Sequence, residues 1–178
     1  MHPLHNHWPH PVVSASNSSE GIAIMNEKET KEHKHTKEDL IAGLNEDLSR
    51  EYQAIIAYTV YSQTMKGAQF MNIAAELEVH AGEELSHAIM IANQIDYLGG
   101  KPVVTPKPVK TSDKAEDMLR FDLDNEGETI KNYRLRVRQA ESLNYFALAE
   151  TLSKILVDEQ DHHNSLATAL GIDPPEIN

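Results

Sequence analysis

One pattern of metal-binding residue types occurs twice in this chain: a glutamate is followed 33 residues later by a Glu-x-x-His segment. The first copy consists of Glu51, Glu84 and His87. The second copy has the same spacing and consists of Glu126, Glu159 and His162. A glutamate and a histidine three residues apart lie on one face of a helix, so they can bind the same ion. Four carboxylates and two imidazoles are a complete ligand set for two metal ions inside a four-helix bundle.

The ligand types restrict the metals that such a site would bind. Two histidines and four carboxylates offer mostly oxygen, which suits Fe(II), Mn(II) or Zn(II) and lacks the thiolates that soft metals prefer. Carboxylates that bridge two ions allow a site with two metals, and carboxylate-bridged iron can give two electrons to O2 or H2O2. We therefore expect two iron ions per subunit, with manganese or zinc as alternatives that the sequence leaves open.

Tyrosines occupy equivalent positions in the two copies. Tyr58 lies one heptad after Glu51, and Tyr133 lies one heptad after Glu126, on the same helix face in each case. A tyrosine there can hydrogen-bond a ligand carboxylate or supply an electron; the alternative is a core aromatic ring whose hydroxyl is satisfied elsewhere. On this basis Tyr58 joins the six predicted ligands as a candidate catalytic residue.

Other charged residues near these motifs are expected to have ordinary structural roles. His80, one turn before Glu84, is expected to be a polar core or solvated residue rather than part of an ion path. His163 follows His162 and points about 100° away from it, so it should not share the site. The remaining acids are expected on a mostly solvated acidic face, namely Glu76, Glu78, Glu83, Asp122, Asp124 and Glu128.

Four segments with an apolar heptad pattern must hold the candidate ligands in place. Helices are predicted over residues 36–67, 68–98, 112–142 and 144–170. Thr36 is a good N-cap, and the acidic residues after it favour the positive end of the first helix. Residues 101–111 contain three prolines and cannot be helical, so they form an extended crossover. The sequence therefore predicts an all-α fold, an antiparallel four-helix bundle with a long crossover between its second and third helices.

The candidate glutamates occupy seam positions where apolar residues are expected. A buried charge is costly unless it is paired, protonated or bound to a metal. No Lys or Arg interrupts the seams nearby, so four clustered carboxylates would repel one another and raise their own pKa values. Two divalent ions would resolve this repulsion. The alternative is that these glutamates face solvent and that the helix phases are wrong.

Composition excludes several classes of function and divides the chain. The 178 residues include no cysteine, which rules out disulfides, thiolate zinc sites and a rubredoxin-type iron site. The formal net charge of −12 disfavours a nucleic-acid partner. Neither a membrane span nor a signal peptide is expected, so we predict a soluble cytoplasmic protein. Residues 1–35 are predicted to be a disordered, His-rich and charged extension, residues 36–171 the bundle, and residues 172–178 a C-terminal tail.

Residues 36–170 resemble the ferritin-like superfamily, and bacterioferritin most closely. The resemblance is carried by Glu51, Tyr58, Glu84-x-x-His87, Glu126, Asp158-Glu159-x-x-His162 and the stretch Met118-Leu119-Arg120-Phe121-Asp122-Leu123. It implies that Glu51 and His87 bind one iron, that Glu126 and His162 bind a second, and that the glutamates of the two Glu-x-x-His segments bridge them. The implied activity is that of a ferroxidase, which oxidises Fe(II) with O2 or H2O2 and stores the product as a mineral inside a homo-oligomeric shell.

Two departures from that family bear on the cofactor and the assembly. Bacterioferritin has a haem-binding methionine directly after the first bridging glutamate, and this chain has Leu85 there, so no haem is predicted. Only eight residues follow the last predicted helix, so the fifth helix of 24-subunit ferritins is expected to be absent. Cages of 12 or 24 subunits and a dimer all stay open. The alternative function is a ferritin-like redox enzyme that stores no mineral, such as a rubrerythrin-like peroxidase, a manganese catalase or an oxidase.

Overall fold

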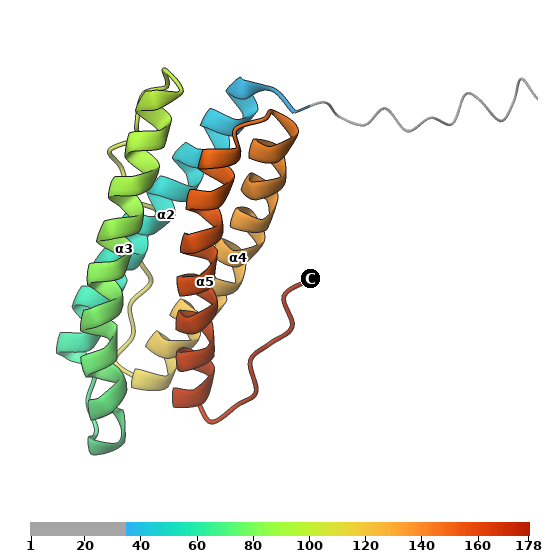
Figure 1. Ribbon diagram of the computed structural model, residues 1–178. Coiled ribbons are helices and arrows are strands. Elements are labelled where there is room, and N and C mark those ends of the chain that lie inside the picture. Colours follow the sequence, from blue (N-terminus) through green and yellow to red (C-terminus); the bar gives the residue numbers. More distant parts are fainter. Residues whose placement is uncertain (1–34) are drawn as a thin grey trace, which may run out of the picture. The chain divides into compact units, whose positions relative to one another are not determined.

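The computed structural model describes residues 35–178, and within them four α-helices form an antiparallel bundle without any strand (Figure 1). The helices are α2 (Lys37–Thr64), α3 (Met71–Tyr97), α4 (Ala115–Ser142) and α5 (Phe146–Ala169). A 3-10 turn, η1 (Ala68–Phe70), leads into α3, where the sequence had predicted helix from residue 68. The predicted all-α four-helix bundle is confirmed. The predicted disordered extension over residues 1–35 lies outside the described residues except for His35.

Hydrogen bonds before α2 and α4 explain where these helices begin. Thr36 caps α2 as predicted, because its hydroxyl accepts the Asp39 N–H while the Asp39 carboxylate accepts the Thr36 N–H. Helix α4 begins at Ala115 rather than at the predicted residue 112. The hydroxyl of Ser112 accepts the N–H of Lys114, which forms a turn outside the helix.

Helices α3, α4 and α5 end in the same way, with one residue in the left-handed backbone conformation. These residues are Gly99 (φ 77°), Asn144 (φ 63°) and Gly171 (φ 66°). In each case the N–H groups of this residue and of the next donate to carbonyl groups of the last helical turn at 2.7 to 3.1 Å, which is the Schellman motif. The tight turn between α4 and α5 therefore depends on an asparagine that tolerates a positive φ.

The predicted crossover runs along α2. Helix α3 ends at one end of the bundle and α4 begins at the other, so the connecting chain spans its length (Figure 1). Side chains spaced along one face of α2 hold this segment by hydrogen bonds. Asn45 accepts the N–H of Val103, and Ser49, Gln53 and Tyr61 donate to the carbonyl groups of Thr105, Pro108 and Lys110. The proline-rich segment thus satisfies its backbone groups without forming a helix or a strand.

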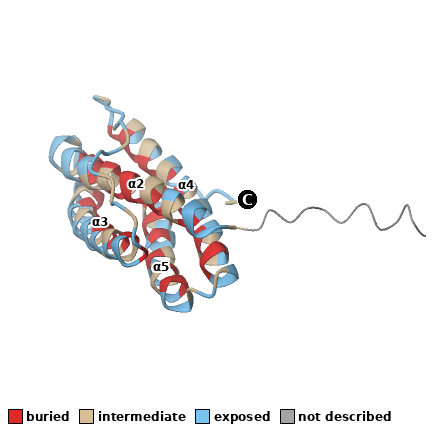
Figure 2. Ribbon diagram, turned by 90° about the horizontal axis from the view of Figure 1, so that it is seen from above, coloured by how far each residue is buried: buried red, intermediate tan, exposed pale blue. Residues whose placement is uncertain are grey.

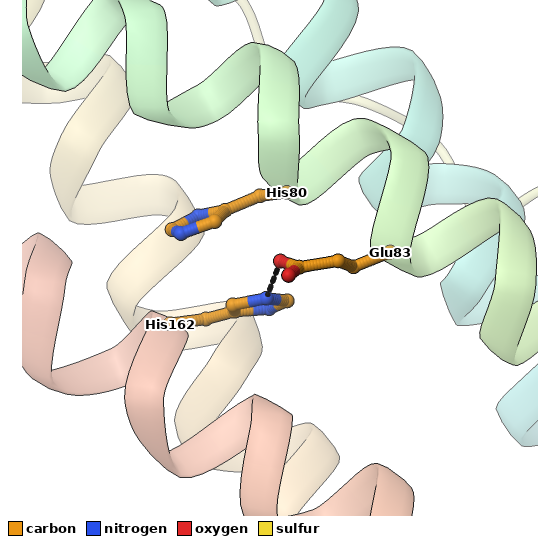
Figure 3. Close-up of side chains that lie close together, drawn as sticks. All are labelled: His80, Glu83 and His162. Atoms are coloured by element: carbon orange, nitrogen blue, oxygen red, sulfur yellow. Dashed lines mark hydrogen bonds and ion pairs between the residues drawn. The ribbon is translucent and has the colours of Figure 1, made fainter.

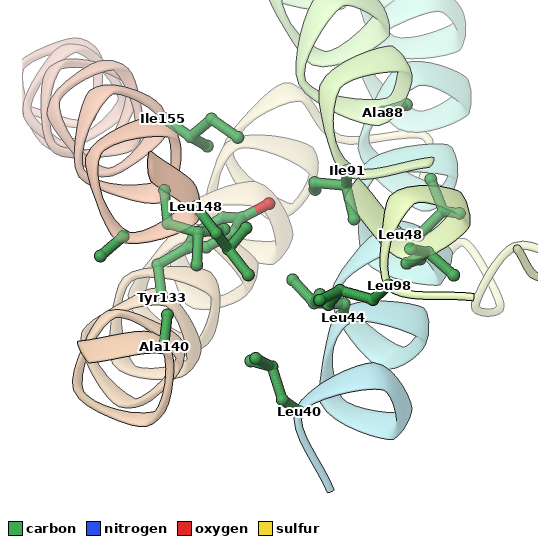
Figure 4. Close-up of a cluster of buried hydrophobic side chains, with 13 residues drawn as sticks. Leu40, Leu44, Leu48, Ala88, Ile91, Leu98, Tyr133, Ala140, Leu148 and Ile155 are labelled. Atoms are coloured by element: carbon green, nitrogen blue, oxygen red, sulfur yellow. The ribbon is translucent and has the colours of Figure 1, made fainter. Parts of the chain in front are cut away.

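Two apolar clusters fill the bundle and leave a polar layer between them. On each helix, the buried positions face the interior of the bundle (Figure 2). On α2, Leu48 belongs to the first cluster (Figure 4) and Tyr58 to the second, and Glu51 falls between them. On α3, Leu77 and Ile91 flank Glu84 in the same manner. The candidate site therefore lies in the middle of the bundle. None of the described helices is long and apolar enough to cross a membrane.

Candidate metal centre

All six residues predicted as ligands lie together in one buried layer, and none exposes more than 3% of its surface. They form two overlapping groups in which one ligand atom from each residue lies within 4.8 Å of the others. The first group is Glu51, Glu84, His87 and Glu159. The second group is Glu84, Glu126, Glu159 and His162. Two residues, Glu84 and Glu159, therefore belong to both groups.

The two shared glutamates each present one oxygen to each histidine. Glu84 places Oε2 3.1 Å from His87 Nδ1 and Oε1 3.0 Å from His162 Nδ1. Glu159 places Oε1 3.2 Å from His87 Nδ1 and Oε2 3.8 Å from His162 Nδ1. Glu51 instead faces one histidine, since its Oε2 lies 3.5 Å from His87 Nδ1. The layer therefore has the ligand set of a two-metal bundle, two Glu-x-x-His segments and two further glutamates, in which Glu84 and Glu159 would bridge the ions and Glu51 and Glu126 would be terminal ligands.

Several buried polar atoms in this layer lack a hydrogen-bond partner. Among the described residues they include Oε2 of Glu51, Oε1 of Glu84, both oxygens of Glu159 and Nδ1 of His162. Unpaired buried polar atoms are rare because each costs about 1–3 kcal/mol. Here they converge on common points and are acceptors or metal-ligating nitrogens. The donor set therefore fits the binding of cations, and its oxygen-rich chemistry suits Fe, Mn or Zn.

Burial and mutual repulsion perturb the pKa values of these groups. Burial first, and then the negative charges of neighbouring glutamates, raise the pKa of Glu84 and of Glu159 well above the usual range. Burial alone would lower the pKa of His87, but the adjacent carboxylates of Glu159, Glu51 and Glu84 outweigh it and raise that pKa strongly. Without metal the layer therefore retains protons, and divalent ions would take their place.

A tyrosine supports each terminal carboxylate. The hydroxyl of Tyr58 donates a hydrogen bond to Glu126, and that of Tyr133 donates to Glu51. Both tyrosines are fully buried, and burial followed by the charge of the accepting glutamate raises the pKa of each well above its usual value. The hydroxyls therefore stay protonated as donors. The two contacts correspond to each other, since every residue of the first hairpin has its counterpart 75 positions later.

The acidic residues that precede the shared glutamates contact the outer nitrogens of the histidines. Glu83 Oε2 lies 2.9 Å from His162 Nε2 (Figure 3), and Asp158 Oδ2 lies 3.2 Å from His87 Nε2. Such a contact fixes the tautomer that leaves Nδ1 free to bind a metal. The sequence had placed Glu83 on the solvated acidic face, and its side chain is indeed 45% exposed. Its equivalence to Asp158 in the repeat was the signal for this contact.

His80 lies beside the centre, as a polar residue of the core. It is 5% exposed, and its ring stacks on that of His162 at 4.0 Å between centroids (Figure 3). Burial and the neighbouring His162 lower the pKa of His80 to about 4. With Glu83 and His162 it forms a further group of possible ligands. His163 is also buried, and it belongs to none of these groups.

The prediction that Asp122 lies on a solvated face is wrong. Asp122 is 2% exposed, because it lies one turn before Glu126 and shares its buried helix face. Burial, and then the charge of Glu126, raise the pKa of Asp122 well above its usual value. Its counterpart Asp47 is also buried, but Asp47 Oδ2 accepts a hydrogen bond from Arg136 Nε at 2.8 Å. Burial raises the pKa of Asp47 to about 7, against the opposing effect of Arg136.

An antiparallel four-helix bundle with two Glu-x-x-His segments facing each other across a buried layer defines the class of protein. A profile of the ferritin-like domain matches residues 41–173. The chain therefore belongs to the ferritin-like family. The predicted resemblance is thereby confirmed, whereas the metal-binding roles of the six residues stay predictions.

Two solved structures resemble this fold, and a related sequence aligns with much of this chain. A ferritin-like diiron-carboxylate protein from Bacillus anthracis is 36% identical, with a TM-score of 0.73, over 75% of this chain and 96% of that one. A bacterioferritin-related protein from Bacteroides fragilis, described as a dodecameric thioferritin, is 27% identical, with a TM-score of 0.71, over 86% of this chain and 94% of that one. A bacterial ferritin from Synechocystis sp. is 26% identical over 138 residues, which are 76% of this chain and 88% of that one.

Proposed function

We propose that this protein is a ferroxidase that binds two Fe(II) ions per subunit, oxidises them with O2 or H2O2 and stores the ferric product in an oligomeric shell. The observation that carries the proposal is that Glu84 and Glu159 each present one oxygen to each histidine. Carboxylates so placed hold two ions close enough to act together. Two Fe(II) ions supply the two electrons that reduce O2 to H2O2, or H2O2 to two molecules of water, with uptake of two protons.

Charge supports both the binding of Fe(II) and the loss of the product. Two Fe(II) ions carry four positive charges, which the four glutamates of the layer balance. Two Fe(III) ions carry six, so the oxidised pair has two charges that the protein does not neutralise. This excess favours uptake of hydroxide or oxide and growth of a mineral. Tyr58 and Tyr133 hold the terminal carboxylates in place through this change, because each donates a hydrogen bond to one of them.

Storage requires an assembly that encloses the product. The related protein from Bacteroides fragilis is described as dodecameric, which supports a closed shell for this chain as well. Aerobic loading of metal-free protein with excess Fe(II), followed by size exclusion and counting of iron, tests this part of the proposal. Tens of irons per subunit in a high-mass assembly are expected. About two irons per subunit on a small oligomer would instead favour a redox enzyme.

The second candidate function is a ferritin-like redox enzyme that stores no mineral. The Bacillus anthracis structure, described only as a ferritin-like diiron-carboxylate protein, is more similar in sequence than the bacterioferritin relatives cited above. If iron loading stops at two per subunit, turnover of H2O2 by the iron and manganese forms becomes the next measurement. A rubrerythrin-like peroxidase or a manganese catalase predicts turnover there.

The oxidation step is tested separately from storage. Glu84→Ala and Glu159→Ala should each abolish rapid Fe(II) oxidation, because each removes an oxygen from both metal positions. Asp161→Asn is the matched control, since Asp161 is exposed on the turn that carries His162. Rapid oxidation by both alanine variants, with helical content intact, would rule out the two-metal assignment.

A further inference from the structure

The internal repeat makes the two halves of the centre equivalent, and one break in it leaves a carboxylate without a cation. Asp47 and Asp122 are counterparts, each one turn before a terminal glutamate. Arg136 neutralises Asp47 by a hydrogen bond of 2.8 Å. The counterpart of Arg136 in the other half is Tyr61, whose hydroxyl donates to the carbonyl of Lys110 instead. Asp122 therefore lacks the arginine partner that Asp47 has.

Asp122 is nevertheless buried and its carboxylate is incompletely bonded. The residue is 2% exposed, and its Oδ2 has no hydrogen-bond partner. Burial, and then the nearby Asp122, raise the pKa of Tyr61 to about 12. Burying an unpaired carboxylate destabilises the folded state, so its presence requires an explanation, such as a bound cation.

A narrow cavity connects Asp122 to the metal centre. It is about 10 Å³ in volume, the size of one water molecule. Its lining contains Asp122 and the four glutamates of the layer, and extends between α2 and α4 to Asn125 and Ala54, which are partly exposed. Asp47 does not line it. A basic residue, Arg50, also lines the cavity; its Nε lies 3.9 Å from Glu46 Oε1, which pairs with Lys107 Nζ at 2.7 Å.

We infer that Asp122 binds a divalent cation in transit, on the path by which metal reaches the centre from the space between α2 and α4. An arriving ion supplies the positive charge that Arg136 supplies to Asp47. Asp122, Asn125 and Thr129 offer oxygen atoms along the lining, which suits hard or borderline ions such as Fe(II), Mn(II) and Co(II). Asp47, the counterpart of Asp122, does not line this cavity and is paired with Arg136. This inference rests on the proposed function, in that the centre must bind metal.

The rate of Co(II) binding tests the inference without depending on iron oxidation. Co(II) is mixed with the metal-free full-length protein by stopped flow, and its visible absorption reports arrival at the centre. Asp122→Asn should slow association about tenfold, within the range that local charge exerts on association rates, and should leave the final stoichiometry at two ions per subunit. Asp124→Asn removes the same charge from an exposed position on α4 and should bind at the wild-type rate. Asp47→Asn, in the equivalent place of the other half, should also bind at that rate.

The possible failures are distinguishable. If Asp122→Asn binds as fast as wild type, or if Asp124→Asn is slowed equally, Asp122 has no role in uptake. If Asp122→Asn also loses an ion at equilibrium, Asp122 is a permanent ligand rather than a transit site, and the inference is wrong. Asp122→Ser provides a second neutral variant, with circular dichroism as the check on folding. If wild type binds no Co(II), or if Glu84→Gln still binds two ions, the proposed function itself fails.

Discussion

Binding of two metal ions should raise the free energy of unfolding of the subunit, and the ligand groups predict how much of this gain each substitution removes. At a free ion concentration 100 times the dissociation constant, each independent site adds about 2.7 kcal/mol to the free energy of unfolding. Two sites add about 5 kcal/mol. In a chain of this size each kcal/mol raises the melting temperature by about 2–4 °C, so saturating Zn(II) should raise it by about 10–20 °C. Zn(II) is chosen because it undergoes no redox change.

The overlap of the two ligand groups predicts unequal effects of substitution. Glu84 belongs to both groups, so Glu84→Gln should lose most of the Zn(II)-induced shift. His87 belongs to one group, so His87→Gln should keep about half of it. Asp161→Asn should keep all of it, because Asp161 is exposed and outside both groups. Melting curves followed by circular dichroism, with chelator and with Zn(II), measure these differences.

The metal-free state should respond to the same substitution with the opposite sign. Burial and neighbouring carboxylates raise the pKa of Glu84, so its charged form destabilises the metal-free fold. Glu84→Gln removes that charge and should raise the melting temperature in chelator while it lowers the gain from Zn(II). A variant that melts lower than wild type in chelator and still gains the full shift would refute both the repulsion and the bridging role.

Three further predictions concern pH, the tyrosines and a helix end. Burial raises the pKa of Asp47 from 3.8 to about 7. The folded state thus holds the proton of Asp47 more tightly than the unfolded chain does. The urea midpoint of the metal-free protein should therefore fall as pH rises from about 4 through 7. A midpoint that rises over this range would contradict the prediction. Tyr58→Phe and Tyr133→Phe should each slow initial Fe(II) oxidation about tenfold, because each removes a hydrogen bond to a terminal carboxylate. Both variants should still bind two ions at equilibrium. Unchanged oxidation rates would show that the tyrosines have no part in the mechanism. Asn144→Ala should cost about 1 kcal/mol in urea unfolding because of its left-handed φ, whereas Asn144→Gly should not.

The fold and the clustering of the six residues were predictable because both follow from the helical periodicity of the sequence. The i, i+3 spacing of Glu84 and His87 fixes them on one helix face wherever the helix begins. The position of Glu51 in an apolar seam fixes its depth in the bundle. An error of three residues at the start of α4 did not disturb this, since the seam phase is independent of the helix end.

The contacts of the surrounding acids were less predictable because residue type and helix phase gave opposite answers. The helical phase places Asp122 on the buried face that carries Glu126. An aspartate is usually exposed, so the sequence was interpreted as placing Asp122 in solvent, and this prediction is wrong. The contact of Asp158 with His87 joins two helices, so no spacing within one helix shows it. The hydrogen bonds from Ser49 to the crossover are likewise between segments, and the proline-rich segment has no periodicity that would set their register.

A duplicated centre gives its two metal positions nearly the same ligands, so any direction of metal movement must come from residues that break the repeat. Two such breaks lie around the same half. Asp122 lacks the arginine that neutralises Asp47, and His80 takes the place that Ile155 fills with apolar packing in the other half. The Glu51 half therefore has a salt bridge and a hydrocarbon side chain at these positions, and the Glu126 half has an unpaired carboxylate and an imidazole. If metal movement follows these groups, the Glu126 half should exchange its ion faster than the Glu51 half. Exchange of bound Co(II) for Zn(II) would then proceed in two phases of equal amplitude, and Asp122→Asn should slow the fast phase alone.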